Sequence, residues 1–310
     1  IDASGGPPCH GPVPCPNFCW MAADVSSHAW LKDCTIDPGL AQSLAFARWD
    51  EILRPAHREV GDDDVTEFVV NKKTLIIHES GGKKNGTIPE VIWGCGLALA
   101  HFLQDEEMFP PRSLIGNRCL ELGSGTGLVG LTAALLGCEV VLSDLPEVLP
   151  QLQANVERNG IETASVVAVP WGAASVAGHP APFDLVLLSD VVYMGYAEDL
   201  AKLVTTLSAV CDTNTTALLC YKRRFHDCEQ AFFELLSKEF TVKAVTSPKY
   251  AELMMFEDIH IFQLHKFSAM YQEAVSAERL WQQKVLRAKL AHRNNMNKSN
   301  NDDSNLNDNV

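Results

Sequence analysis

Residues 118–130 read RCLELGSGTGLVG, an apolar run that passes into three closely spaced glycines and then into a second apolar stretch. This order predicts a buried strand at Arg118–Leu122, a Gly-rich turn, and a helix at Leu128–Leu136. Glycines allow the backbone of such a turn to approach a bound ligand closely. The segment therefore predicts an α/β protein with a ligand site where the first strand ends.

Two kinds of ligand fit this turn. The spacing Gly125-x-Gly127-x-x-Gly130 satisfies the dinucleotide fingerprint, so a nicotinamide dehydrogenase is one alternative. Glu121, just before the first glycine, disfavours it, because dinucleotide enzymes usually continue with apolar residues there. A Glu-Leu pair followed by Gly-x-Gly-x-Gly favours S-adenosylmethionine instead. That ligand has no pyrophosphate, and the Glu121 carboxylate can face its cationic amino-acid moiety.

The chain on both sides of the turn alternates between strand-like and helix-like runs. Such alternation predicts βαβ units and a mainly parallel sheet. Further strands are expected at 139–142, 165–169, 184–188, 217–220, 241–245 and 259–264. Further helices are expected at 146–159, 197–210 and 229–238. Upstream, the pattern predicts a hairpin of Thr66–Val70 and Thr74–His78 and a helix at Ile88–Leu103.

The predicted α/β domain covers residues 63–266, and the flanking segments differ from it in composition. Residues 1–62 form a Pro/Cys-rich flexible extension, with weak helical character at 40–58. The Cys and His spacing there matches no zinc pattern, so no metal site is expected. Residues 267–293 predict a basic amphipathic helix, which either packs on the domain or binds a partner. The Asn-rich tail at 294–310 has almost nothing apolar to bury and is expected to be disordered.

Charge and composition restrict the partners. The 310 residues contain 25 Lys and Arg against 39 Asp and Glu, a net charge of −14. This acidity disfavours nucleic acid and favours a partner that presents lysine. No apolar run approaches the roughly 20 residues of a membrane span, so no membrane association is expected. The ten cysteines form no compact framework, which predicts free thiols in the cytosol or nucleus. We expect a monomer.

Two acidic residues follow predicted strands on the ligand side of the sheet. Asp144 ends the strand after the Gly-rich turn, where it can accept both ribose hydroxyls of a nucleoside; it can also cap the next helix. Asp190, in the run Ser189-Asp190-Val191-Val192-Tyr193, can orient an incoming amine and accept its proton. On periodicity alone, Asp190 is a helix cap and Tyr193 a packing residue.

Several motifs occur in one order along residues 65–266. They are the hairpin before Trp93, LELGSGTGLVG, SDLP at 143–146, PWG at 170–172, Asp190-x-x-Tyr193 and EDIHI at 257–261. Together they resemble the methyltransferase-like family of seven-strand, S-adenosylmethionine-dependent protein-lysine methyltransferases. The resemblance implies a class I, Rossmann-like fold with an N-terminal β-hairpin extension.

The resemblance also implies residue roles. It makes Asp190 and Tyr193 the catalytic pair at the methyl-transfer site. It places the cofactor at Trp93, Glu121, Gly123, Ser124, Gly125, Asp144, Trp171 and Ser189. Family members modify non-histone proteins such as heat-shock chaperones, an AAA ATPase and translation factors. The long N-terminus and basic C-terminal helix depart from the family pattern and leave the substrate open.

The predicted reaction is methyl transfer to the ε-amine of a protein lysine. Only the neutral amine attacks, so the site must orient it and let its proton leave. Two alternatives stay open. One is a methyltransferase for a small molecule or another acceptor, since a fold does not determine the acceptor. The other is a non-catalytic cofactor-binding scaffold that works through its C-terminal helix.

Overall fold

A computed structural model describes residues 56–60, 63–79, 91–193, 197–224, 226–245, 248–250 and 258–268. The predicted C-terminal helix at 267–293, apart from its first two residues, the tail at 294–310 and most of the N-terminal extension lie outside these residues. In the described part of the chain, no helix is long and apolar enough to cross a membrane.

A sheet of seven strands forms the centre of the domain, and all seven were predicted to within two residues of their bounds. They are β4 (Arg118–Leu122), β5 (Glu139–Asp144), β6 (Ala164–Ala168), β7 (Leu185–Ser189), β8 (Thr216–Lys222), β9 (Phe240–Ala244) and β10 (Ile259–Lys266). Their spatial order is β6-β5-β4-β7-β8-β10-β9. Only β10 is antiparallel to its neighbours; β4 through β8 pair in parallel. The seven-stranded, mainly parallel sheet expected from the sequence is confirmed.

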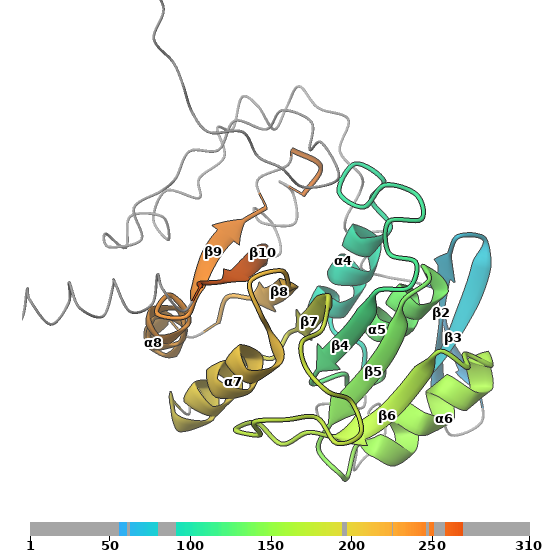
Figure 1. Cartoon of the computed structure of the whole chain (residues 1–310). Helices are drawn as coiled ribbons and strands as arrows, with labels where there is room; N and C mark the ends of the chain where they lie inside the picture. The colour runs from blue at the N-terminus through green and yellow to red at the C-terminus, as the bar shows by residue number, and fades with distance from the viewer. Residues whose placement is uncertain are drawn as a thin grey trace, which may run out of the picture. The chain divides into compact units, whose positions relative to one another are not determined.

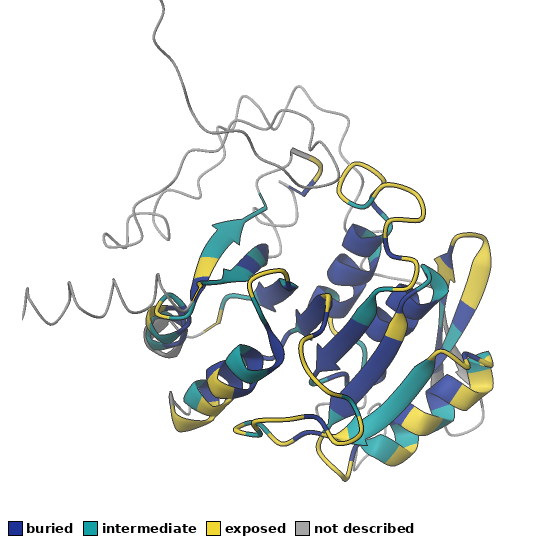
Figure 2. Cartoon of the chain, in the orientation of Figure 1, coloured by how far each residue is buried: buried dark blue, intermediate teal, exposed yellow. Residues whose placement is uncertain are grey.

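Five helices cover the sheet. Figure 1 shows α4 (Gly94–Leu103), α5 (Leu128–Leu135) and α6 (Leu149–Asn159) on one face, with α7 (Ala197–Val210) and α8 (His226–Leu236) on the other. The central strands are therefore buried on both faces, as Figure 2 shows, which explains their continuous apolar sequences. A short 3₁₀ helix, η2 (Pro248–Tyr250), precedes β10.

The predicted hairpin belongs to a separate antiparallel sheet of three strands. The predicted pair corresponds to β2 (Asp63–Val70) and β3 (Lys73–Glu79), and β1 (Ala56–Val60) pairs with β2. The sequence analysis placed residues 56–58 in a weakly helical segment, and that expectation was wrong. The sequence AHREV of β1 has no clear alternation, so its strand conformation depends on pairing with β2.

The helix predicted from Ile88 begins later, at Gly94. Trp93 stands at its N-cap in an extended conformation, with φ −96° and ψ 155°. Similarly, the helix predicted from Pro146 begins at Leu149, because residues 145–148 form a turn. Both late starts leave a non-helical segment beside the carboxyl ends of the strands, where the cavity described next is found.

Candidate functional site

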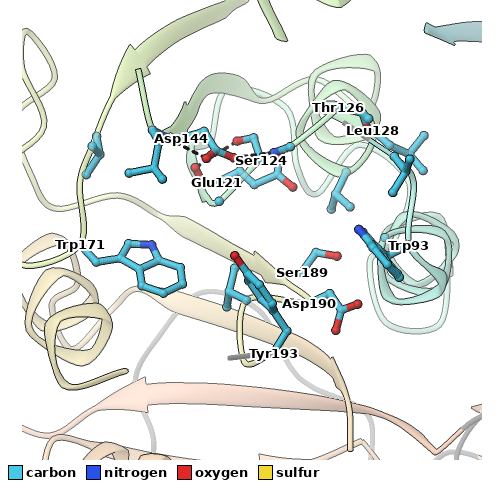
Figure 3. Close-up of a pocket in the computed structure, with 18 of the residues that line it drawn as sticks. Trp93, Glu121, Ser124, Thr126, Leu128, Asp144, Trp171, Ser189, Asp190 and Tyr193 are labelled. Atoms are coloured by element: carbon cyan, nitrogen blue, oxygen red, sulfur yellow. Dashed lines mark hydrogen bonds between the residues drawn. The ribbon is translucent and has the colours of Figure 1, made fainter. Parts of the chain in front are cut away.

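A cavity of about 620 Å³ opens at the carboxyl ends of β4, β5 and β7. Connections from β4 and β7 run to opposite faces of the sheet, so a crevice forms between these adjacent strands. All ten residues predicted for the site line this cavity, and Figure 3 shows how they surround it. They are Trp93, Glu121, Gly123, Ser124, Gly125, Asp144, Trp171, Ser189, Asp190 and Tyr193. The structure thus brings the predicted set together, while the individual roles stay predictions.

Hydrogen bonds donated by its backbone N–H groups, most of them to strand β5, hold the Gly-rich turn in place. The N–H groups of Gly123 and Ser124 both donate to the carbonyl oxygen of Ser143, each at 2.9 Å. The N–H of Gly125 donates to Asp144 Oδ2 at 2.8 Å, and that of Gly127 donates to the carbonyl of Ser124. These N–H groups are therefore engaged within the protein. A pyrophosphate would need such donors, so the geometry disfavours the dinucleotide alternative.

Gly123 has to be glycine for two reasons. Its φ is +71°, a conformation that strains other residues. A Cβ there would also lie 2.8 Å from Val191 Cγ1, so that the Val191 side chain or the turn would have to shift. The turn after β4 and the segment after β7 thus pack directly on each other. This contact places Asp190 beside the Gly-rich turn.

Glu121 is a carboxylic acid inside the central strand β4, only 1% exposed. Its Oε2 accepts the N–H of Gly130 in the first turn of α5, at 3.0 Å. Burial raises the pKa of Glu121 to about 8, although the bond from Gly130 opposes this shift. Glu121 lines the cavity, and with this pKa its carboxyl group is mostly protonated at neutral pH in the ligand-free protein. Its predicted role beside a cationic ligand group therefore requires that it lose this proton when the ligand binds. It also fixes the start of α5, a role the sequence analysis did not foresee.

Asp144 lies at the end of β5 with both carboxylate oxygens anchored. Oδ2 accepts the N–H of Gly125 at 2.8 Å, and Oδ1 accepts the N–H of Leu145 at 2.7 Å. Burial raises its pKa, and these two backbone bonds act in the opposite direction. Each oxygen keeps lone pairs that can accept further hydrogen bonds. The carboxylate is therefore rigid and suited to a pair of ribose hydroxyls.

Two tryptophans and a serine line other parts of the cavity. Trp93, at the start of α4, is 42% exposed, although it is a large aromatic residue. Figure 3 shows Trp93 and Trp171 on opposite sides of the space, with Ser189 between them at the end of β7. Exposed aromatic rings at a concave surface provide faces on which a flat ligand group can stack.

Asp190 and Tyr193 follow β7 at the end of the cavity away from Asp144 in Figure 3. Asp190 has a φ of +55°, which Asp tolerates better than most residues. Its backbone N–H donates to the carbonyl of Cys220 on the neighbouring strand β8 at 2.8 Å. Tyr193 is half-buried, and burial followed by the charges of Asp144 and Asp190 raises its pKa. Its phenol stays protonated and can donate a hydrogen bond.

The sequence analysis missed Arg224, which also lines the cavity. Its guanidinium forms two bonds to the Asp190 carboxylate, Nη1 to Oδ1 at 2.7 Å and Nη2 to Oδ2 at 2.8 Å. The signal was present in the sequence: Tyr221-Lys222-Arg223-Arg224 directly follows the predicted apolar strand 217–220. By the rule that ligands bind beyond the carboxyl ends of parallel strands, Arg224 should have been included.

The residues present fit S-adenosylmethionine. The cavity has the volume expected for a ligand of nucleoside size, and its surface combines anchored carboxylates with aromatic rings. Asp144 suits the ribose, the tryptophans suit a flat base, and Glu121 suits a cationic amino acid. Among the described residues, no group of three or more His, Cys, Asp or Glu could hold a metal ion.

Comparisons with known proteins agree with this geometry. The chain is 30% identical over 227 residues to protein N-lysine methyltransferase METTL21A of Danio rerio, covering 72% of this chain and 97% of the relative. It is 35% identical over 207 residues to EEF1A lysine methyltransferase 3 of Mus musculus, covering 66% of this chain and 84% of the relative.

A solved structure shares the fold at low sequence identity. It is the 16S rRNA N2 G1207 methyltransferase of T. thermophilus in complex with AdoMet and guanosine, with a TM-score of 0.50 and 18% identity. The superposition covers 67% of this chain and 52% of that one. The family profile described as lysine methyltransferase matches residues 69–239. With its cavity, its relatives and this profile in agreement, the chain belongs to the family of S-adenosylmethionine-dependent lysine methyltransferases.

Proposed function

We propose that this enzyme methylates a lysine ε-amine of a folded non-histone protein, with Asp190 and Tyr193 at the transfer site. The observation that carries the proposal is their position, since both line the same cavity as the Gly-rich turn and Asp144. A ligand bound by its ribose at Asp144 would extend along the cavity toward Asp190. A lysine entering at that end would approach the cofactor beside Asp190 and Tyr193.

S-adenosylmethionine supplies a methyl group on a positively charged sulfur. Held by Asp144, Glu121 and the two tryptophans, it would offer this carbon to the lone pair of the lysine nitrogen, and the electrons of the broken S–CH₃ bond would neutralise the sulfur. The attacking amine has lost its proton to water beforehand, so the product is a methylammonium. We assign the proton to water because both oxygens of Asp190 already accept bonds from Arg224. Asp190 then orients the amine, and Tyr193 shapes the channel through which it enters.

The proposed substrate is a chaperone, an AAA ATPase or a translation factor. One relative is named for EEF1A, which supports the translation-factor class. The net charge of −14 favours a protein that presents lysines on its surface. We place the reaction in the cytosol or nucleus. Among the residues that the structure describes, Cys95, Cys119, Cys138, Cys211 and Cys220 are free and buried, which supports a reducing compartment.

A radiolabel experiment tests the proposal. Purified protein is incubated with tritiated S-adenosylmethionine and a cell lysate, and in parallel with purified EEF1A, before separation by size. We expect a discrete labelled protein band that Asp190→Ala abolishes. Glu162→Ala, which removes an exposed carboxylate outside the cavity, should leave the band unchanged. Label confined to small molecules or RNA, or a band that persists in Asp190→Ala, would contradict the proposal.

A further inference from the structure

An internal ion pair closes the acceptor end of the cavity. The Asp190 carboxylate and the Arg224 guanidinium meet through two parallel hydrogen bonds, the geometry in which arginine binds carboxylates most strongly. Their side chains are 7% and 25% exposed, so water screens the pair only in part. Asp190, which is assigned to orient the substrate lysine, is therefore already paired with the cationic side chain of Arg224.

Contacts with neighbouring segments fix the backbone of both Asp190 and Arg224. Asp190 is fixed by its N–H bond to Cys220 on β8 and by the packing of Val191 against Gly123. Arg224 lies just beyond β8, and its N–H donates to Oε1 of the buried Glu229 on α8 at 2.6 Å. Because the two residues follow the neighbouring parallel strands β7 and β8, the fold itself places them side by side at the carboxyl edge of the sheet.

The neighbouring groups do not change this charge balance at the cavity wall. Burial raises the pKa of the Cys95 thiol on α4 well above its usual value, so it is neutral. The pKa of Tyr193 is also raised, so it too is neutral. The hydrogen bonds that Arg224 donates to Asp190 raise the pKa of its guanidinium, with a contribution from Glu229, so the guanidinium is cationic. Glu229 itself does not line the cavity.

We propose that Arg224 is a positioning residue that neutralises Asp190, so that the acceptor end of the cavity offers no net negative charge to the cofactor's sulfur or to the incoming lysine. This inference rests on the proposed function. An uncompensated carboxylate would stabilise the ammonium form of lysine, which cannot attack. With Arg224 in place, the positive sulfur disfavours a second cation, and the amine reacts in its neutral form.

Arg223 provides a matched control. Its guanidinium makes the same kind of contact one residue earlier, with Nε 3.1 Å from Asp258 Oδ2 and Nη2 2.9 Å from Asp258 Oδ1. His260 Nε2 lies 2.8 Å from Asp258 Oδ1 and completes this second cluster. Neither Arg223 nor Asp258 lines the cavity. Removing the Arg223 charge therefore alters a similar ion pair without altering the cavity wall.

The test compares two ligands that differ at sulfur by one methyl group and one positive charge. Calorimetry gives the dissociation constants of S-adenosylmethionine and S-adenosylhomocysteine for each full-length variant, and their ratio reports the charge near the sulfur. In Arg224→Gln, the unpaired Asp190 should shift this ratio about three- to tenfold toward S-adenosylmethionine. In Asp190→Asn, the unpaired Arg224 should shift it by a similar factor in the opposite direction.

Three further variants complete the experiment. The double variant Asp190→Asn/Arg224→Gln removes both charges and should return the ratio to the wild-type value. Arg224→Lys keeps the positive charge and should also give the wild-type ratio. Arg223→Gln should leave the ratio unchanged. Equal weakening of both ligands in Arg224→Gln, or shifts of the same sign in both single variants, would overturn the proposal.

Two provisions keep the result interpretable. If Arg224→Gln fails to fold, Asp190→Asn compared with the double variant still reports the charge of Arg224, and an unchanged ratio between those two would overturn the proposal. The measurement uses no acceptor protein. A failure to find lysine methylation would therefore reject the proposed function, whereas a charge-independent ratio would reject only the role of Arg224.

Discussion

The carboxyl group of Glu121 lies within the central strand β4, and its pKa is raised to about 8, mainly by burial. Between its ordinary pKa of 4.5 and this value, the folded protein binds more protons at Glu121 than the unfolded chain does. The contribution of this residue to the free energy of unfolding therefore falls as pH rises from about 4.5 to about 8 and is constant above that range.

Glu121→Gln should remove this pH dependence in the ligand-free protein. We expect the free energy of unfolding of the wild type to fall by on the order of a few kcal/mol relative to the variant between pH 5 and pH 8.5. Urea denaturation at several pH values measures it. Glu139→Gln, at the exposed start of β5, serves as the control and should follow the wild type. Parallel curves for wild type and Glu121→Gln would contradict the prediction.

Asp144 should contribute to cofactor affinity through its two anchored oxygens. Asp144→Ala removes both acceptors for the ribose, and we expect S-adenosylmethionine to bind about ten- to a hundredfold more weakly. Asp199→Ala removes an exposed carboxylate of α7 that lines the same cavity, and we expect less than about a threefold effect. Calorimetry compares the two variants, and similar losses in both would show that Asp144 acts only through its charge.

At the scale of elements, two asparagines join helix α6 to strand β3. Asn155 accepts the N–H of His78 and donates to its carbonyl, while Asn159 does the same with Ile76. Two residues four apart on a helix are separated by about the same distance as two residues two apart on a strand, so both asparagines can bond to β3 at once. Asn155 also donates to the carbonyl of Thr126, within the Gly-rich turn. The small sheet is in this way connected to the ligand site.

Asn155→Ala should therefore destabilise the protein markedly. The side chain is fully buried, and its removal leaves the N–H of His78 and the carbonyl of Thr126 without this partner. We expect a loss of about 2–4 kcal/mol in the free energy of unfolding, measured by urea denaturation. Gln153→Ala removes an exposed amide from the same helix and should cost less than about 0.5 kcal/mol. Equal costs would mean that these amide bonds contribute little.

At the scale of the whole molecule, charge governs the approach of the substrate. A net charge of −14 attracts a partner that presents lysines, and this attraction weakens as salt screens it. We expect the methylation rate at low substrate concentration to fall severalfold between about 50 and 300 mM KCl. The rate at saturating substrate should change little. A rate at low substrate that is independent of salt would show that the acidic surface does not steer the partner.

Local sequence patterns were sufficient for the α/β class, most elements, the Gly-rich turn and the acidic residues Glu121, Asp144 and Asp190. Trp93 and Trp171 were placed at the cavity only by the family resemblance. The reason is physical: continuous apolar runs such as Leu185–Ser189 reveal strands buried on both faces, and the carboxyl ends of parallel strands share one edge. Residues that follow such strands, as Asp144 and Asp190 do, can therefore be placed near one another without a structure.

Three features depended on contacts between residues distant in the sequence. Strand β1 forms because it pairs with β2. The N–H groups of the Gly-rich turn are occupied because they donate to Ser143 and Asp144. The charge of Asp190 is balanced because Arg224, 34 residues later, follows the adjacent strand. The sequence predicts that side chains such as Asp144 and Asp190 reach the cavity, since they follow the carboxyl ends of strands. Their charge and hydrogen-bond partners depend on burial and neighbours, which exist only once the sheet has formed.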